Sequence, residues 1–532
     1  MLTPLALLTL GCASGPDPTA GEFVAGEAFQ LSITPIYVAS QAEMIDEAKE
    51  IEIRVLDGDG NETPFALYQG EDKTFENTEI RALADAKILL VGRDDDDIIF
   101  HGRSEPLSIS SGAARIYIFI ARDGAPLSLP ELDTPSAMGS LHALGDGRFL
   151  SVGGTQEGSR PESLTSAVTE FDMGVLGIGE ETRGLSSSIH ATTSTGWVGH
   201  TSTVLPDGRI LVVGGARGLS DETGGLVGQS TATSSVSLLD PSADLNTAGT
   251  PLNHGRLAHR ATLGPDDIVV VTGGFAARDS GNSVASFAEL YDPLEDSWTV
   301  ATGSLYTAGI FHAQARLGDT GVLVCGGLDA ALVPSSECQV ILPTASIESA
   351  PDLSQPLLHA ELTDLGEGRV LLTGGLVAPS TGEPLSLTSD LSATTAAWIL
   401  DDTGWQPVGP MRIPRALHST QRTPDGRVVI AGGVSRIDAS SERFGQAYGG
   451  LLYDAADAVP CVEIFDPVGD TFTLLTNCEP SSASGTLPSP VAMPAIAHDS
   501  TFGTLITGGL APDPRQSAAH RTLLYPSFSA RQ

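Results

Sequence analysis

The sequence predicts an all-β protein in which an N-terminal immunoglobulin-like β-sandwich is followed by a seven-bladed β-propeller. Two observations support this fold class. Up to about residue 124, apolar and polar residues alternate with the period of two that half-buried strands require. From about residue 138, a pattern that ends in a glycine pair recurs seven times, and repeats of roughly 50 residues are typical of propeller blades. We therefore assign residues 27–124 to the sandwich and residues 126–532 to the propeller.

The leading module has enough strand-like runs for a small immunoglobulin-like sandwich. Its alternating apolar positions are Phe29, Leu31 and Ile33, then Ile51, Ile53 and Val55, and later Ile116, Ile118 and Ile120. Residues 57–62 begin like a calcium loop, but Glu62 stands where such a loop needs a glycine. We interpret this segment as a hairpin turn and the four aspartates at 94–97 as a solvated turn, and we predict no metal site.

Each repeat of the second region contains two strand-like runs, a tight turn between them and a closing glycine pair. The pairs are Gly153-Gly154, Gly214-Gly215, Gly273-Gly274, Gly326-Gly327, Gly374-Gly375, Gly432-Gly433 and Gly508-Gly509, at spacings of 61, 59, 53, 48, 58 and 76 residues. The turn Asp207-Gly208 permits the positive φ values of a tight hairpin. Further strand-like runs follow, as at Ala288–Pro293, and they bring each repeat to the four strands of a propeller blade.

The third repeat carries the fullest motif. Its glycine pair, Gly273-Gly274, is followed by Tyr291 and, after six intervening residues, by Trp298. This motif resembles the kelch-repeat family, and the resemblance covers about four hundred residues. It implies a kelch-type propeller, which is also the central fold of galactose-oxidase-like enzymes. It says little about activity, because kelch propellers serve many functions.

The ring of blades needs a closing strand. The last repeat offers Leu505–Thr507 and Leu523–Tyr525 as its second and third strands, and only Ser527–Gln532 remains for a fourth. The segment Pro126–Pro135 precedes the first repeat as Trp405–Met411 precedes the sixth. We therefore predict that Pro126–Pro135 completes the seventh blade and joins the two ends of the ring.

The first residues predict export. Met1–Gly11 is apolar and too short to cross a bilayer core of about 30 Å, and Cys12 follows it directly. Residues 9–12 resemble the lipobox of bacterial lipoproteins, although no Lys or Arg precedes Cys12. We expect a signal peptide at 1–11, lipidation of Cys12 and a linker at 12–26, in an outer-membrane lipoprotein or a periplasmic or secreted protein of the bacterial cell envelope. The alternative is an apolar terminus with a free thiol.

The remaining cysteines form two close pairs. Pairing of Cys325 with Cys338 and of Cys461 with Cys478 agrees with the predicted strands and with an oxidising compartment. Two other connectivities, or four buried free thiols, remain as alternatives. None of the pairs has the C-x-x-C spacing of zinc or redox sites.

Charge excludes one class of partner. The chain has 66 acidic and 28 basic residues and a net charge of −38. Such a surplus of carboxylates repels phosphate backbones and anionic membranes over a Debye length of about 8–10 Å. We expect no nucleic-acid partner, and contact with a membrane only through the lipid anchor.

Histidine recurs fourteen residues before four of the glycine pairs, at His200, His259, His312 and His418, and one residue out of phase at His359. A ring of imidazoles around a central channel could bind a metal ion. The interpretation that we favour is structural: each histidine bonds the backbone of a neighbouring turn, and separate blades keep the rings far apart.

No enzyme class leaves its usual signature. The copper–radical site of galactose-oxidase-like enzymes needs a cysteine linked to a tyrosine, a second tyrosine and two histidines, whereas the four late cysteines here are assigned to pairs. Motifs of serine hydrolases, nucleotide-binding loops and zinc hydrolases are missing from the sequence. We therefore predict no catalytic residues, no cofactor and no enzymatic activity.

Recognition is the function that remains. Long insertions follow several glycine pairs, and loops on a rigid scaffold often carry binding sites. The binding residues that we predict on this loop face are Trp197, Arg217, Arg256, Arg278, Tyr306, Arg415 and Arg436. They indicate a pocket for a protein or carbohydrate ligand in a non-catalytic recognition module. Alternatively, the arginines pair with neighbouring carboxylates and hold the blades together, or the chain is a carbohydrate-active or oxidase-like propeller enzyme with an unidentified site.

Overall fold

The computed structural model describes most of the repeat region and the main strands of the leading module. The described residues are 10–11, 30–36, 43–56, 62–69, 74–77, 83–95, 97–104, 107–109, 113–122, 127–128, 139–145, 147–154, 168–172, 186–190, 198–216, 232–278, 281–303, 305, 309–379, 382–385, 390–437, 458–475, 492–499, 503–509 and 523–525. Within these ranges the protein is almost entirely β, as the sequence predicts. None of the helices within them has the length and apolar character that spanning a membrane requires.

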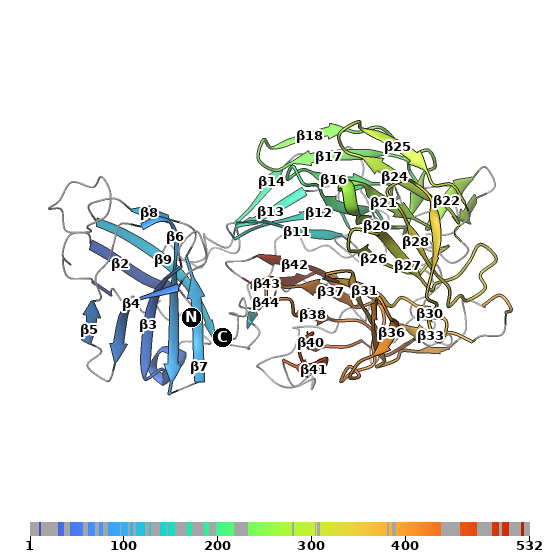
Figure 1. Ribbon diagram of the computed structural model, residues 1–532. Coiled ribbons are helices and arrows are strands. Elements are labelled where there is room, and N and C mark those ends of the chain that lie inside the picture. Colours follow the sequence, from blue (N-terminus) through green and yellow to red (C-terminus); the bar gives the residue numbers. More distant parts are fainter. Residues whose placement is uncertain are drawn as a thin grey trace.

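The leading module, blue in Figure 1, lies beside the repeat region. Its elements are β1 (Leu10–Gly11), β2 (Gln30–Ile36), α1 (Glu43–Glu47), β3 (Glu50–Leu56), β4 (Glu62–Gln69), β5 (Thr74–Asn77), β6 (Leu83–Asp94), β7 (Asp97–Arg103), β8 (Leu107–Ile109) and β9 (Ala113–Arg122). Pairing runs in the order β1-β2-β9-β7-β6-β3-β4-β5, with β8 on β6, and β2 and β9 are parallel. Alternate residues such as Ile53, Phe100 and Ile118 are buried in one core.

The all-β prediction is therefore confirmed for this module. The described strands follow a single path of hydrogen-bonded neighbours and do not divide into two separate sheets. The immunoglobulin-like arrangement stays a prediction.

The described strands of the repeat region form seven four-stranded antiparallel sheets, one for each glycine pair, besides smaller connecting sheets. Blades one to three are β11 (Ser140–Gly145), β12 (Arg148–Val152), β13 (Val168–Asp172) and β14 (Ser186–His190); β15 (Thr201–Val204), β16 (Ile210–Val213), β17 (Val236–Asp240) and β18 (Leu245–Ala248); and β20 (Arg260–Leu263), β21 (Val269–Thr272), β24 (Ala288–Asp292) and β25 (Ser297–Val300). Blades four and five are β26 (Ala313–Leu317), β27 (Gly321–Cys325), β28 (Cys338–Ile341) and β29 (Ile347–Ala350); and β31 (Glu361–Gly366), β32 (Arg369–Thr373), β35 (Ala397–Asp401) and β36 (Gly404–Pro407).

Blades six and seven complete the ring. They are β37 (Ser419–Arg422), β38 (Val428–Ala431), β40 (Val462–Asp466) and β41 (Thr471–Leu474); and β42 (Ala495–Asp499), β43 (Gly503–Thr507), β44 (Leu523–Tyr525) and β10 (Leu127–Ser128). Leu127 pairs with Leu524, so a strand from before the first repeat closes the last blade, as predicted. The first strands of successive blades contact one another around the ring, and β42 contacts β11.

Short elements connect the blades. They are β19 (Arg256–Leu257), β22 (Phe275–Arg278) and β23 (Gly281–Val284) in one sheet, the pair β30 (Leu357–Leu358) and β33 (Leu376–Val377), the pair β34 (Leu391–Ser392) and β39 (Arg436–Ile437), and the 3₁₀ turn η4 (Pro265–Asp267). Between blades, apolar side chains from facing sheets share a core. Val270 and Leu290 of blade three, for example, cluster with Val322 and Val324 of blade four.

The glycine pairs lie where chains approach closely. Gly214 has a φ of +65°, and a Cβ atom there would lie 2.5 Å from the carbonyl oxygen of Arg256. Gly208, in the turn of the same blade, also has a positive φ, of +84°, but a Cβ atom there would meet nothing within 4 Å. Glycine is thus required at Gly214 both by its positive φ and by the lack of room for a side chain.

Replacing Gly214 by alanine is therefore expected to cost more than replacing Gly208. Both changes force an L residue into the left-handed region, at about 1–2 kcal/mol, and Gly214→Ala adds about 1–3 kcal/mol of overpacking. Chemical denaturation of the two variants measures the difference. Equal losses would show that the close approach at Gly214 does not constrain the fold.

Candidate functional site

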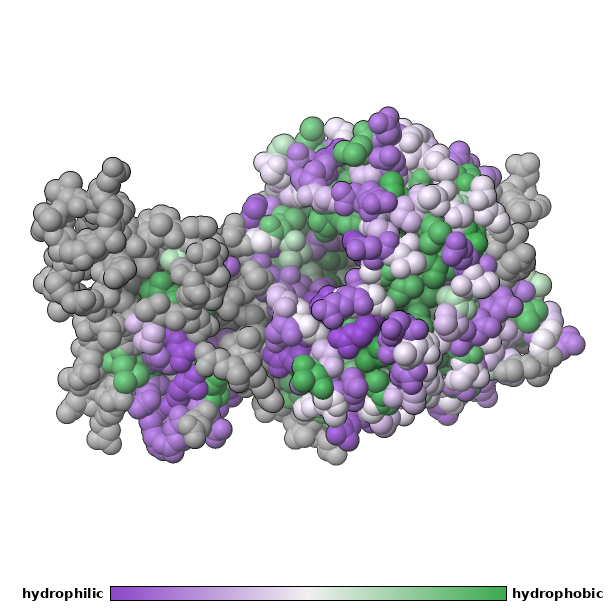
Figure 2. Space-filling model, viewed as in Figure 1, coloured by the Kyte–Doolittle hydropathy of each residue, from purple (hydrophilic) through white to green (hydrophobic). Residues whose placement is uncertain are grey.

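A chamber lies on the axis of the ring, where the innermost strands begin. Its volume is about 220 Å³, and residues from every blade line it. The space-filling view shows a hollow in the propeller surface near β11 and β42 (Figure 2). The chamber is where all seven blades converge, so its side chains come from segments far apart in the sequence.

One backbone position of each of blades two to seven forms a rim around the axis. The described residues there are Gly199, Ala258, Phe311, His359, Leu417 and Met493, all with φ between +51° and +65°. The amide of Leu417 donates to the carbonyl of His359 at 3.2 Å, and that of His359 donates to the carbonyl of Phe311 at 2.8 Å. Similar bonds join Met493 to Leu417 and Ala258 to Gly199, both at 2.7 Å. Main-chain bonds between blades therefore hold this rim.

The next residue of the chain is histidine in four blades, and three of these side chains link neighbouring blades. Nε2 of His312 lies 2.8 Å from the Thr272 hydroxyl, and Nε2 of His418 lies 2.9 Å from that of Thr373. Burial lowers the pKa of His312 to about 3 and that of His418 well below its usual value, so both imidazoles are uncharged at neutral pH. His259 bonds Thr201 in the same way, at 2.9 Å.

The predicted structural role of these histidines is confirmed, with hydroxyl partners in place of backbone turns. Although separate blades carry these rings, the rings share one space. His200, His259, His312, His359 and His418 all line the one axial chamber. They converge because each follows or occupies the rim position of its blade.

His359 differs from the others because it is one residue out of phase and occupies the rim position itself. Its side chain is 5% exposed, and Nε2 has no hydrogen-bond partner in the part of the chain that the structure describes. The ring lies against Phe311, with centroids 4.3 Å apart. Burial, and then the charge of Arg260, lower the pKa of His359 to about 3. The chamber therefore contains a buried, uncharged imidazole with an open nitrogen.

An ion pair supplies the charge of the chamber. Arg260 of blade three meets Glu361 of blade five, with Nη2 to Oε1 at 2.6 Å and Nη1 to Oε2 at 3.3 Å. This bidentate pair skips blade four and so reaches across the axial region. It offers a fixed carboxylate and guanidinium beside the uncharged imidazoles.

Two of the predicted binding arginines are not available to a ligand. Arg256 and Arg415 are 0% exposed, and each pairs with an equally buried carboxylate. Arg256 pairs with Glu289 of its own blade, and Arg415 pairs with Glu463 at 2.6 Å. Nη1 of each also donates to two backbone carbonyls. These arginines hold their blades together, as the alternative interpretation stated, and the prediction that they bind a ligand is wrong.

The described residues do not assemble the predicted loop-face pocket. Arg436 is exposed at the start of β39, and Arg278 ends β22, which belongs to a different sheet. Trp197, Arg217, Tyr306 and Cys12 lie outside the described residues. Arg260, Glu361 and His359 are not among the binding residues that the sequence predicts. The one signal in the sequence is the position of His359, which is one residue out of phase with the other repeated histidines.

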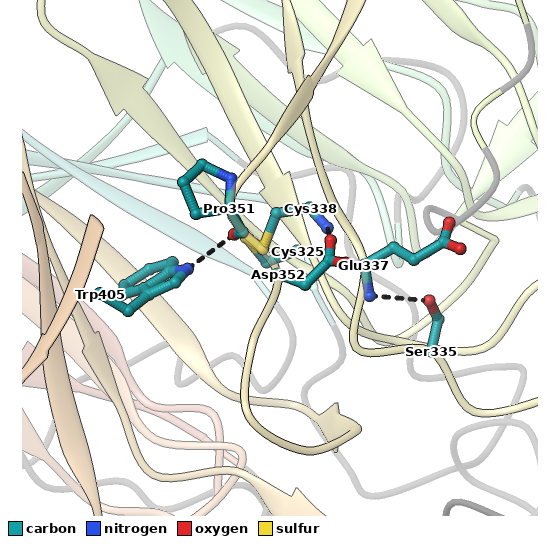
Figure 3. Close-up of a disulfide and its surroundings, with 7 residues drawn as sticks. All are labelled: Cys325, Ser335, Glu337, Cys338, Pro351, Asp352 and Trp405. Carbon is teal, nitrogen blue, oxygen red and sulfur yellow. Dashed lines mark hydrogen bonds between the residues drawn. A yellow bond between two sulfur atoms is a disulfide. The ribbon is translucent and has the colours of Figure 1, made fainter. Parts of the chain in front are cut away.

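The first predicted disulfide is confirmed (Figure 3). Cys325 and Cys338 are directly opposite each other on β27 and β28, with an S–S distance of 2.06 Å. Cys461 is also disulfide-bonded, and Cys478 lies outside the described residues.

The residues that the structure describes do not fit a copper–radical site. Within the described ranges, no group of three or more His, Cys, Asp or Glu side chains is arranged to hold a metal ion. Cys325 and Cys338 are used in their disulfide, and the Tyr291 hydroxyl donates to Asp296 at 2.8 Å on the outer part of blade three. Leu417 and Phe311, and not tyrosines, are at the rim.

Comparisons with known proteins bear on the fold. No family model matches the chain, and no curated protein matches it. Among solved structures, the chain is similar to a fungal alcohol oxidase of the AA5 family, described as having catalytic diversity and as in complex with copper. The TM-score is 0.54 and the identity 14%, over 76% of this chain and 77% of the oxidase. This likeness supports a propeller-like, all-β fold.

The same finding corrects the functional prediction. We expected a non-catalytic recognition module and no enzymatic activity, whereas the similar fold is that of an oxidase. At 14% identity this likeness shows the fold alone, so the oxidase-like alternative that the sequence left open is taken up below as a proposal. Residues from several blades converge on the axial chamber, so a site there would leave no contiguous motif in the sequence.

Proposed function

We propose that the chain is an oxidase-like, carbohydrate-active propeller enzyme whose active site is the axial chamber. The observation that carries the proposal is the buried Nε2 of His359, which lies in the chamber wall with no described partner. A buried polar atom without a partner costs about 1–3 kcal/mol, so a ligand that satisfies it is favoured. The likeness to an alcohol oxidase supports the same class.

The chamber suits a small hydroxylated substrate, such as an alcohol or a single sugar unit. Its volume of about 220 Å³ is below the roughly 300–1,000 Å³ of pockets for drug-sized ligands, as expected for a small substrate. The uncharged His359 ring accepts a hydrogen bond from a hydroxyl group, and Arg260 donates to a neighbouring oxygen. The Glu361 carboxylate, fixed by Arg260, is the group placed to take a proton from the substrate. These residues supply substrate binding and proton removal; oxidation of an alcohol to a carbonyl also needs an acceptor for two electrons, such as dioxygen, which the assay provides as a co-substrate.

Two finer features remain proposals. The repeat motif supports the kelch type, and the residues around Cys12 support export and lipid anchoring at the cell envelope. We keep carbohydrate as the proposed ligand class, but we place it in the axial chamber and not at the loop face. Metabolic labelling of the expressed protein with a radioactive fatty acid would test the lipidation of Cys12 separately.

The test is activity on a panel of alcohols, monosaccharides and glycans, scored by carbonyl formation and by new reducing ends. His359→Phe keeps a ring against Phe311 and removes the open nitrogen. We expect kcat/KM to fall by about 10²–10³, with little change in melting temperature. The control is His254→Gln, at a histidine outside the chamber whose side chain is 58% exposed. Full activity of His359→Phe would rule out the chamber as the active site.

A further inference from the structure

A second cavity lies on the outer side of the propeller, between blades four and five. Its volume is about 330 Å³. Trp398 of β35 and Trp405 of β36 line it, both half-buried, and Asp352 and Ser354 are exposed at its edge. Buried Leu357 completes the apolar wall. We call this cavity the tryptophan cleft.

The cleft exists because blade five lacks the buried ion pair of blades three and six. Leu357 is seventeen residues before Gly374, the place that Arg415 holds relative to Gly432. Trp398 pairs with Leu372 on the strand before the glycine pair, as Glu463 pairs with Ile430. Leucine and tryptophan therefore replace arginine and glutamate, and this apolar pair leaves space open to solvent where the ion pair is fully buried.

The groups around the cleft are held in place before any ligand binds. Nε1 of Trp405 donates to the Pro351 carbonyl at 2.8 Å, which fixes the indole. The amide of Cys338 donates to Oδ1 of Asp352 at 3.1 Å, so that the disulfide-bearing strand positions the carboxylate (Figure 3). Preorganised walls of this kind lower the entropic cost of binding.

We propose that the tryptophan cleft binds one pyranose ring of a carbohydrate. A pyranose has an apolar face, which indoles contact favourably, and a rim of hydroxyl groups, which Asp352 and Ser354 can bond. An alkyl chain would match the indoles and Leu357 but would offer no hydrogen bond to the Asp352 carboxylate or the Ser354 hydroxyl. The volume of about 330 Å³ accommodates one ring with its substituents. This site does not depend on the proposed function of the axial chamber.

The experiment measures binding of methyl glycosides and soluble polysaccharides to the full chain, by calorimetry and by affinity electrophoresis. Trp398→Leu is expected to weaken binding at least tenfold. Asp352→Asn keeps an oxygen for the Cys338 amide, removes the charge and is expected to weaken binding severalfold. The matched control is Trp298→Phe, because the Trp298 indole bonds the Thr250 carbonyl in blade three, where Glu289 fills the equivalent space.

Three outcomes would overturn the proposal: no glycan of the panel binds, both cleft variants bind as the native chain does, or an aliphatic probe such as octanoate binds the cleft in place of sugars. Melting temperatures of the variants separate loss of binding from loss of folding. Turnover of small substrates is expected to be unchanged in Trp398→Leu, so failure of the cleft and failure of the axial site are distinguishable.

Discussion

Replacing Glu289 by alanine is expected to lower the free energy of unfolding by about 3–5 kcal/mol. The change leaves the Arg256 guanidinium fully buried without its countercharge, because both side chains are 0% exposed. It also removes the acceptor of the Asn253 amide and side-chain nitrogens, each at 2.8 Å. Urea denaturation followed by tryptophan fluorescence measures the loss.

A surface pair provides the control. Asp319 pairs with Arg316 at 3.1 Å, but its side chain is 98% exposed. Asp319→Ala should therefore change the unfolding free energy by about 0–1 kcal/mol. A Glu289→Ala loss as small as this would contradict the assignment of Arg256 to a structural role.

The double variant Arg256→Leu with Glu289→Trp should recover much of the stability lost in Glu289→Ala. Blade five already uses Leu357 and Trp398 in the equivalent positions. Replacing both partners of a buried ion pair by apolar residues is often close to neutral. If the double variant loses as much unfolding free energy as Glu289→Ala, blade three does not accept the leucine–tryptophan pair of blade five.

Acidification is expected to destabilise the propeller well before its carboxylates are protonated. Burial lowers the pKa of His312 and of His359 to about 3, against about 6.5 in the unfolded chain. The unfolded chain therefore binds more protons, so the stability is complete above about pH 6.5 and is lost as the pH falls toward 3. For each histidine the slope approaches about 1.4 kcal/mol per pH unit. Denaturation at several pH values between 7 and 5 measures this slope.

Two variants identify the source of the slope. His359→Phe removes one titrating group from the chamber and should reduce the slope by about 1.4 kcal/mol per pH unit at most. His312→Gln removes the second of these titrating groups and should reduce the slope by a similar amount at most. A stability profile that is flat between pH 7 and 5 would mean that the chamber histidines are not held uncharged.

The repeat pattern predicted the blades because it depends on local chemistry. Glycine pairs with positive φ, Asp-Gly turns and alternating apolar runs specify each sheet without reference to the rest of the chain. The closing strand was also predictable, since a count of strands in the last repeat left one vacant place, which β10 fills.

The site was harder to predict because it depends on pairings between distant residues. Arg256 and Arg415 resembled ligand-binding residues until the structure placed Glu289 and Glu463 against them. The strand register that brings these carboxylates inward is not visible in the spacing of charges. The sequence showed that His359 is out of phase, but only the ring of blades shows that this shift puts it at the chamber wall.

The central claim is that the axial chamber is the active site, and a crystal structure with a bound substrate tests it most directly. Crystals of the chain are soaked with the substrate of highest kcat/KM from the activity panel. We predict a substrate hydroxyl within about 3 Å of Nε2 of His359, with Arg260 and Glu361 on its other side. Substrate bound elsewhere, with only water in the chamber, would contradict the account.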